Sequence, residues 1–344
     1  MNQEFFNALN LLESEQGIPM EYMIPKIEAA LTKACQKEIG PSTIIRVQID
    51  PVKQDMKVFQ QRTVVPDGTV EDPLTEISVS DAKSISRRHK LGGTVETELK
   101  TKTFRRLSAT QGKQMIVQAI RDAIRERQTR EYEEKKEEII TATVDKIDPQ
   151  NENLILDTGT GYATLLKSEQ IPGEHHNVGD RIKVFICEVR SGEMRGPLVT
   201  LSRIHPGLVR RMFELEIPEI ADGVVMVMGV SREAGSRTKL AVMSRDPDVN
   251  PVGACIGAHG MRINAILDEL NGEKIDVIKY SEVPEEYIAA ALAPATVLEV
   301  TQIEERSYRV RVAPDQLSLA IGKDGQNARL AARLTKCKID IKAD

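Results

Sequence analysis

Two short glycine loops are the residues whose type and spacing could do chemistry in this chain. The first is Ile256-Gly257-Ala258-His259-Gly260, and the second is Ile321-Gly322-Lys323-Asp324-Gly325. A Gly-x-x-Gly turn between two helices lets the backbone approach a nucleic-acid strand closely, because no Cβ stands in the way. One such turn is a weak indication, but a second one with matching flanks predicts a repeated nucleic-acid-binding unit.

The same order of elements is expected around both loops. In the first copy the patterns predict helices and strands over 208–215, 224–230, 238–243, the residues after Pro251, 261–270 and 273–280. In the second copy they predict 285–292, 297–303, 308–312, a short helix opened by Pro314, a helix carrying Leu330 and Leu334, and 338–341. This order of helix, strand, strand, helix, loop, helix and strand resembles the KH domain usual in bacteria. Its Gly-x-x-Gly loop clamps about four nucleotides by their backbone.

Side chains in and beside the two loops are the candidates for RNA contacts, since helix N-termini also favour phosphate. The predicted set is Gly257, Ala258, His259, Gly260 and Arg262 in the first copy, and Gly322, Lys323, Asp324, Gly325, Gln326, Asn327 and Arg329 in the second. Ile256, Ile263, Ile321 and Ala328 are expected to line the groove that holds the bases, although isoleucines here also fit an ordinary core.

A third module is expected ahead of the repeats. Five short strands are predicted over 139–147, 154–157, 162–166, 181–189 and 198–201, with turn residues between them. Five strands with this spacing resemble an OB barrel of the S1 RNA-binding type. Its candidate RNA contacts are Tyr162, Lys167, Phe185, Arg190 and Arg203, although Phe185 lies in an apolar run and fits a core position as well.

The N-terminal part of the chain contains no catalytic spacing. We expect a helix over 5–12 and a second helix that ends near Ile39, with Pro25 either kinking it or marking its start. Strands are expected over 44–49, 57–65 and 74–79, followed by a long linker helix over 109–134.

Composition sets the outer limits of the protein class. A chain of 344 residues is expected to hold two to four domains. It has no apolar run long enough to cross a bilayer and no signal-peptide pattern at its N-terminus, so we expect a cytoplasmic protein with no membrane partner. The four cysteines are scattered, which indicates reduced, buried thiols.

Charge is distributed unevenly along the chain. The net charge is −5, but residues 83–113 carry nine basic and two acidic side chains. Such a block either contacts a polyanion or forms an ordinary solvated face.

Enzymatic patterns fail on spacing. Gly112-Lys113 is not a P-loop, because Leu107 and Gln114 occupy positions that need glycine and a hydroxyl residue. His175-His176 has no cysteine nearby and only Glu174 as a close acid, which makes a poor metal site. We therefore expect no catalytic residues, no metal and no cofactor.

Strings along the whole chain resemble the NusA family of bacterial transcription elongation and termination factors. They are Phe104-Arg105-Arg106-Leu107-Ser108-Ala109, Ile171-Pro172-Gly173-Glu174, His205-Pro206-Gly207-Leu208, Pro251-Val252-Gly253-Ala254-Cys255 and Leu319-Ala320-Ile321-Gly322-Lys323. The resemblance implies a non-enzymatic factor whose N-terminal domain docks on DNA-directed RNA polymerase. Its S1 and KH domains would bind nascent single-stranded RNA and so modulate pausing, termination and antitermination. Other elongation or antitermination factors would join the complex.

The expected architecture is multidomain α+β. It comprises an N-terminal polymerase-binding α/β domain with the linker helix over 1–132, a five-stranded S1-type OB barrel over 133–204, and two tandem prokaryotic-type (type II) KH domains over 205–281 and 282–344. We expect a monomer. The sequence ends soon after the last predicted strand, so the acidic C-terminal repeats of some relatives, and autoinhibition by them, are not expected.

Two other functions stay open. S1 and KH domains also occur together in polynucleotide phosphorylase and exosome subunits, which lack this N-terminal domain; phosphate-dependent shortening of RNA would indicate such an enzyme. A ribosome-associated KH protein would sediment with ribosomes rather than with polymerase.

Overall fold

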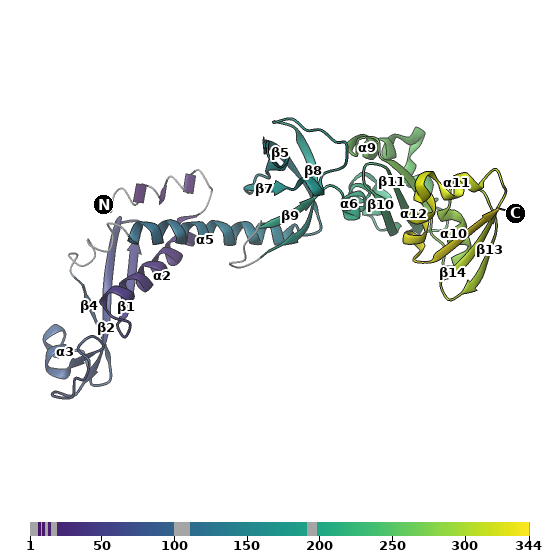
Figure 1. The fold of residues 1–344 in the computed structure, drawn as a ribbon. Coiled ribbons are helices and arrows are strands. Elements are labelled where there is room, and N and C mark those ends of the chain that lie inside the picture. Colours follow the sequence, from purple (N-terminus) through teal and green to yellow (C-terminus); the bar gives the residue numbers. More distant parts are fainter. Residues whose placement is uncertain are drawn as a thin grey trace. The chain divides into compact units, whose positions relative to one another are not determined.

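The chain divides into two units, Met1–Arg127 and Gln128–Asp344 (Figure 1). The structure, a computed structural model, describes residues 6–7, 9–10, 13–14, 19–99, 111–190 and 198–343, with the side chains of 38 and 111–116 left out. Of the helices that it describes, none has both the length and the apolar character needed to span a bilayer.

In the first unit a helix packs on a small mixed sheet. The elements are α2 (Met20–Ile39), β1 (Ile44–Asp50), β2 (Asp55–Val65), β3 (Glu76–Ser78), α3 (Val79–Ile85), β4 (Thr94–Glu98) and the first part of α5 (Gln111–Glu134). Strand β2 pairs antiparallel with β1 and β4 and parallel with β3. Ile45, Val47 and Ile49 alternate along β1 and are buried with Ile27 and Leu31 of α2, as the strand and helix periods require.

Some details of this unit differ from the predictions. Pro25 lies inside α2, which begins at Met20. The third predicted strand is shorter than expected, because the Ser78 side chain accepts a hydrogen bond from Asp81 N and caps α3 directly after it. Helix α3 and strand β4 were not predicted. The helix expected over 5–12 falls largely outside the described residues. Of its apolar residues, Phe6 and Leu9 are described, and both are buried.

The second unit begins with a five-stranded antiparallel sheet that is nearly closed into a barrel. Its strands are β5 (Ile139–Ile147), β6 (Leu154–Asp157), β7 (Tyr162–Leu165), β8 (Arg181–Val189) and β9 (Val199–Ser202), in the order β7-β6-β5-β8-β9. Along β8, Val184 and Ile186 belong to the barrel core, while Phe185 between them is buried in the neighbouring core around α6. This alternation confirms the core position of Phe185 and removes it as a stacking platform for RNA.

Two KH domains with one topology follow the barrel. The first comprises α6 (Pro206–Glu216), α7 (Pro218–Ala221), β10 (Val225–Glu233), β11 (Arg237–Ser244), α8 (Pro251–Ile256), α9 (Met261–Glu269) and β12 (Lys274–Lys279). The second comprises α10 (Pro284–Ala291), β13 (Val297–Glu304), β14 (Ser307–Val312), α11 (Leu317–Ile321), α12 (Gln326–Thr335) and β15 (Lys338–Ala343). In each, the first two strands are antiparallel and the third joins the second in parallel, which confirms the predicted repeat.

One boundary in the second KH domain is wrong in the prediction. Helix α11 begins at Leu317 rather than at Pro314. Pro314 lies in the preceding turn, where Gln316 N donates a hydrogen bond to Ala313 O.

Candidate nucleic-acid interface

The two glycine loops have the same backbone conformation. Gly257 has φ 74° and ψ 175°, and Gly322 has φ 75° and ψ 171°. The third residue of each loop, His259 or Asp324, has φ 53°, with ψ 24° and 25° respectively. Each loop is closed by a hydrogen bond of 3.2 Å between the N–H of its last glycine and the carbonyl of its first. Two segments with different central residues therefore form the same turn.

The first glycine of each loop is required by its conformation and by space. A φ near +75° with ψ near 180° belongs to a region that essentially only glycine adopts. A Cβ on Gly257 would lie 2.8 Å from Arg262 Cγ, and a Cβ on Gly322 would lie 2.8 Å from the backbone nitrogen of Asn327. The helix after the loop thus packs directly against the glycine Cα.

The central residues of both loops are available to a ligand. Ala258, His259, Lys323 and Asp324 are all exposed. Immediately before the loops, Ile256 is 38% exposed and Ile321 is 37% exposed. Equal exposure of an isoleucine at matching positions fits a groove wall beside a backbone-binding turn.

The two candidate arginines near the loops are held by carboxylates. Arg262 Nη1 donates to Glu219 Oε2 and to Ala254 O, both at 2.8 Å. Arg329 Nε donates to Glu233 Oε1 at 2.7 Å, its Nη2 donates to Oε2 at 3.2 Å, and its Nη1 donates to Asp324 O. The hydrogen bond from Arg329 holds the pKa of Glu233 below its ordinary range.

Gln326 and Asn327, both expected to contact RNA, take different positions. Gln326 Nε2 donates to Glu233 Oε2 at 2.9 Å and to Ser236 Oγ at 2.7 Å, both in the first KH domain. Asn327 is 1% exposed, and its Nδ2 donates to the carbonyls of Leu292, Leu319 and Ala320. The prediction of an RNA contact by the Asn327 side chain is therefore wrong, because its amide is used inside the domain.

On the barrel, the exposed candidates are Tyr162, Lys167 and Arg190. Tyr162 is 69% exposed on β7. Lys167 Nζ lies 2.7 Å from Glu152 Oε2, and Arg190 Nε lies 3.6 Å from Glu188 Oε2; these surface pairs are weak and can yield to a phosphate.

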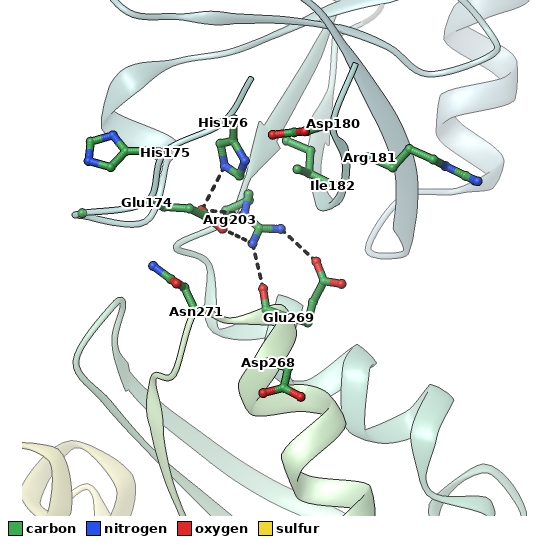
Figure 2. A pocket seen from close by; sticks show the side chains of 11 residues that line it. Glu174, His175, His176, Asp180, Arg181, Ile182, Arg203, Asp268, Glu269 and Asn271 are labelled. Atoms are coloured by element: carbon green, nitrogen blue, oxygen red, sulfur yellow. Dashed lines mark hydrogen bonds and ion pairs between the residues drawn. The ribbon is translucent and has the colours of Figure 1, made fainter. Parts of the chain in front are cut away.

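Arg203 is not part of this exposed surface. It is 1% exposed, and Figure 2 shows its guanidinium between Glu174 and Glu269. All five N–H donors of the guanidinium have acceptors within the protein, so none is left for RNA. The prediction that Arg203 contacts RNA is therefore wrong, because its donors are used inside the protein. No local sequence signal pointed to its partners.

The structure also bears on the metal site judged poor from the sequence and on the basic block over 83–113. Among the described residues, no group of three or more His, Cys, Asp or Glu side chains is arranged to hold a metal ion. In the basic block over 83–113, Lys83, Arg87, Arg88 and Lys90 are exposed, and the rest of the block lies largely outside the described residues.

Three protein-family models match the N-terminal part of the chain and both KH domains. A model described as the NusA N-terminal domain matches residues 4–126. Models described as the NusA-like first KH domain and the NusA-like second KH domain match residues 203–280 and 284–344.

Curated relatives align with the chain from end to end. A protein of Halalkalibacterium halodurans is 43% identical over 100% of this chain and 89% of its own length. One of Bacillus subtilis is 43% identical over 100% of this chain and 92% of its own length, and one of Thermus thermophilus is 36% identical over 97% and 88%. Each is named transcription termination/antitermination protein NusA. The family models match the N-terminal domain and both KH domains, and the relatives align over the whole chain. The chain therefore belongs to the NusA family.

Proposed function

We propose that this protein is a transcription elongation factor. It docks on RNA polymerase through residues 1–132 and binds nascent single-stranded RNA through its barrel and KH domains, and it thereby modulates pausing, termination and antitermination. It works as a monomer in the bacterial cytoplasm, together with other elongation or antitermination factors. The names of the relatives support the place in transcription, and the loop geometry supports the contact with RNA.

The observation that carries RNA binding is the repetition of one turn in two settings. A turn kept only for chain reversal needs no exposed central residues and no open isoleucine beside it, yet both copies have both. In this proposal the loops 257–260 and 322–325 meet the RNA backbone, and Ile256 and Ile321 contact bases.

Charged side chains near the loops and on the barrel supplement this contact. Arg329 has partners for three of its N–H donors among the described residues, which leaves two for a phosphate. By the same count, Arg262 uses two of its five N–H donors among the described residues and keeps three for a phosphate. The Gln326 amide N–H groups would turn to RNA only by giving up Glu233 and Ser236. Lys167 and Arg190 provide positive charge on the barrel.

The test of RNA binding places carboxylates in the loops without touching the glycines. The variant combines Ala258→Asp, His259→Asp and Lys323→Asp, all at exposed positions. Aspartate tolerates the φ of 53° at position 259, so the fold should persist. We expect single-stranded RNA to bind at least a hundredfold more weakly, measured by fluorescence anisotropy, with an unchanged circular dichroism spectrum.

The matched control carries the same three charges elsewhere. Asp substitutions at exposed Thr301 and Gln302 of β13 and Lys279 of β12 change the net charge in the same way, outside both loops. Equal loss of affinity in the two variants would reduce the effect to net charge and contradict the loop assignment.

Polymerase docking needs its own experiment. The full chain and a fragment of residues 1–132 should both co-elute with bacterial core RNA polymerase in gel filtration. If neither does, RNA binding can stand but the elongation-factor proposal fails.

A further inference from the structure

The junction between the barrel and the first KH domain contains buried charges that RNA binding does not use directly. Arg203 follows β9 and is the largest fully buried side chain of the described residues. Its Nε and Nη2 donate to the two carboxylate oxygens of Glu174, at 2.9 and 2.5 Å. Its Nη1 donates to Lys183 O on β8 at 2.6 Å. These partners all belong to the barrel.

The same guanidinium also reaches the first KH domain. Nη2 donates to the main-chain carbonyl of Glu269 at 3.0 Å, and Nη1 lies 3.4 Å from Glu269 Oε1. Glu269 is the last residue of α9, the helix that the first glycine loop opens. Figure 2 shows the side chain spanning from Glu174 on one side to the end of this helix on the other. One buried residue therefore connects the barrel to the helix behind the RNA loop.

A second buried arginine holds the connecting segment from the KH side. Arg232 on β10 and Glu273 are both fully buried and joined by hydrogen bonds of 2.8 to 3.2 Å. Arg232 Nη1 also donates to the main-chain carbonyls of Arg203 and His205, at 2.7 and 3.0 Å. The segment between barrel and KH domain is thus fixed through its backbone as well as through the Arg203 side chain.

Apolar packing across this junction adds to its polar contacts, which also include a hydrogen bond of 2.8 Å from Arg211 Nε of α6 to Glu137 O. Phe185 and Ile171 of the barrel share a core with Leu208 and Phe213 of α6. Burial of apolar surface is non-directional. Hydrogen bonds between charged groups are directional and fix geometry. Removing one partner of a buried ion pair is costly, whereas replacing both partners by apolar groups is often neutral.

We propose that Arg203 is a positioning residue for RNA binding: it fixes the barrel and the first KH domain in one orientation, so that a single RNA strand engages both at once. This inference rests on the proposed function above. Two linked sites bind a common strand with an affinity gain that is lost when their geometry no longer permits simultaneous contact. Arg203 exerts this effect without touching the RNA.

The test compares RNAs of two lengths on the full chain. A tetranucleotide fills about one KH loop, whereas a 20-nucleotide unstructured RNA is long enough to reach the barrel as well. In Arg203→Met we expect affinity for the long RNA to fall about tenfold and affinity for the tetranucleotide to change less than twofold. An equal loss for both lengths would overturn the proposal.

Salt dependence separates positioning from a phosphate contact. A side chain that neutralises one phosphate of a single strand contributes about 0.7 to the slope of log K against log salt. If Arg203→Met removes the barrel from the complex, the contacts of Lys167 and Arg190 are lost together and the slope for the long RNA should fall by about 1.4, whereas a fall of about 0.7 would indicate one direct contact by Arg203 and refute the proposal.

The matched control is Arg181→Met. Arg181 lines the same pocket of about 490 Å3, is exposed, and points away from Arg203 in Figure 2. The control removes the same charge from the same region and should keep the ratio of the two RNA affinities. A loss of the long-RNA advantage equal to that of Arg203→Met would contradict the assignment to Arg203.

A double variant keeps the test informative if Arg203→Met misfolds, since it leaves Glu174 buried without its partner. Glu174→Met with Arg203→Met removes both charges and still lacks the bonds to Glu269. It should fold, as judged by circular dichroism, and still lose the long-RNA advantage; long-RNA affinity equal to that of the unchanged protein would refute the inference.

Orientation is measured without RNA by residual dipolar couplings of backbone amides. One alignment tensor should describe barrel and first KH domain in the unchanged protein, and two should be needed in the double variant. If the unchanged protein binds no RNA, the proposed function fails, and the couplings alone then decide whether Arg203 orients the two domains; one shared tensor in the double variant would show that it does not.

Discussion

The two glycines of the second loop should differ sharply in what they tolerate. Gly322 combines φ 75° with ψ 171°, whereas Gly325 has φ 73° and ψ 15°, in the left-handed helical region. Non-glycine residues visit the left-handed region at a moderate cost, but the conformation of Gly322 is essentially restricted to glycine. We therefore compare Gly322→Ala with Gly325→Ala.

The structure gives the size of the difference. Gly325→Ala should cost about 1 to 2 kcal/mol for its backbone conformation. A Cβ at Gly325 would have Arg329 Nη1, at 3.8 Å, as its nearest neighbour, so no overlap adds to this cost. Gly322→Ala should cost about 1 to 3 kcal/mol in backbone strain and a further 1 to 3 kcal/mol for overpacking. That overlap is with the backbone nitrogen of Asn327 at 2.8 Å, which moves only if α12 moves.

Native-state hydrogen exchange read by mass spectrometry is a suitable assay, because it reports the second KH domain inside the full chain. Over peptides covering 317–335, the free energy of opening should fall about 2 kcal/mol further in Gly322→Ala than in Gly325→Ala. Equal protection in the two variants would refute the argument from conformation and space. The first loop offers a comparison: a Cβ at Gly257 would overlap Arg262 Cγ at 2.8 Å, and this side chain is held by Glu219 and Ala254 O, so a loss of similar size is expected there.

Three further outcomes are expected. Burial alone would raise the pKa of Glu174, but hydrogen bonds from His176 and Arg203 outweigh it and hold that pKa below the ordinary 4.5. The ionised carboxylate therefore stabilises the fold above pH 4.5, and this contribution is lost as the pH falls through the lowered pKa. The difference in melting temperature between Glu174→Gln and the unchanged protein should be largest at pH 7 and should shrink below about pH 4. Lys323→Gln should lower the salt slope of RNA binding by about 0.7, measured by anisotropy titrations at several salt concentrations; an unchanged slope would exclude a phosphate contact. Burial raises the pKa of Cys255 to about 12 and that of Cys187 to about 11, so iodoacetamide at pH 8 should modify neither thiol in the folded protein and both in urea, as peptide masses would show.

Local patterns predicted most of the second unit. The period of two along β8 and the repeated glycine turns are patterns among residues close together in the sequence. The barrel strands and both KH domains could therefore be recognised from the sequence. Helix α3 and strand β4 are too short to show a clear period, and their small core forms only when Val64, Ile77, Ala82 and Val95 meet.

The candidate site was predicted less completely, for a different physical reason. Arginine usually lies on the surface, so the sequence does not show that Arg203 is buried. Its acceptors Glu174 and Glu269 lie 29 and 66 residues away in the chain. Asn327 is the second residue after the loop, where a polar side chain on the exposed face would meet RNA, yet the turn of α12 directs it inward. Partners that only tertiary packing brings together leave no local signal.

The contact of Glu233 with Arg329 bears on how the protein can be divided. Glu233 ends β10 in the first KH domain, while Arg329 belongs to α12 in the second. Ala241 and Ile278 of the first domain are also part of the core of the second. A fragment beginning at residue 282 would lack the carboxylate and expose apolar surface, so its loop would present one more unbalanced positive charge. RNA affinities measured on that fragment would describe a site that the intact chain does not contain, and the tandem pair is the smallest portion in which the second loop keeps its own charge environment.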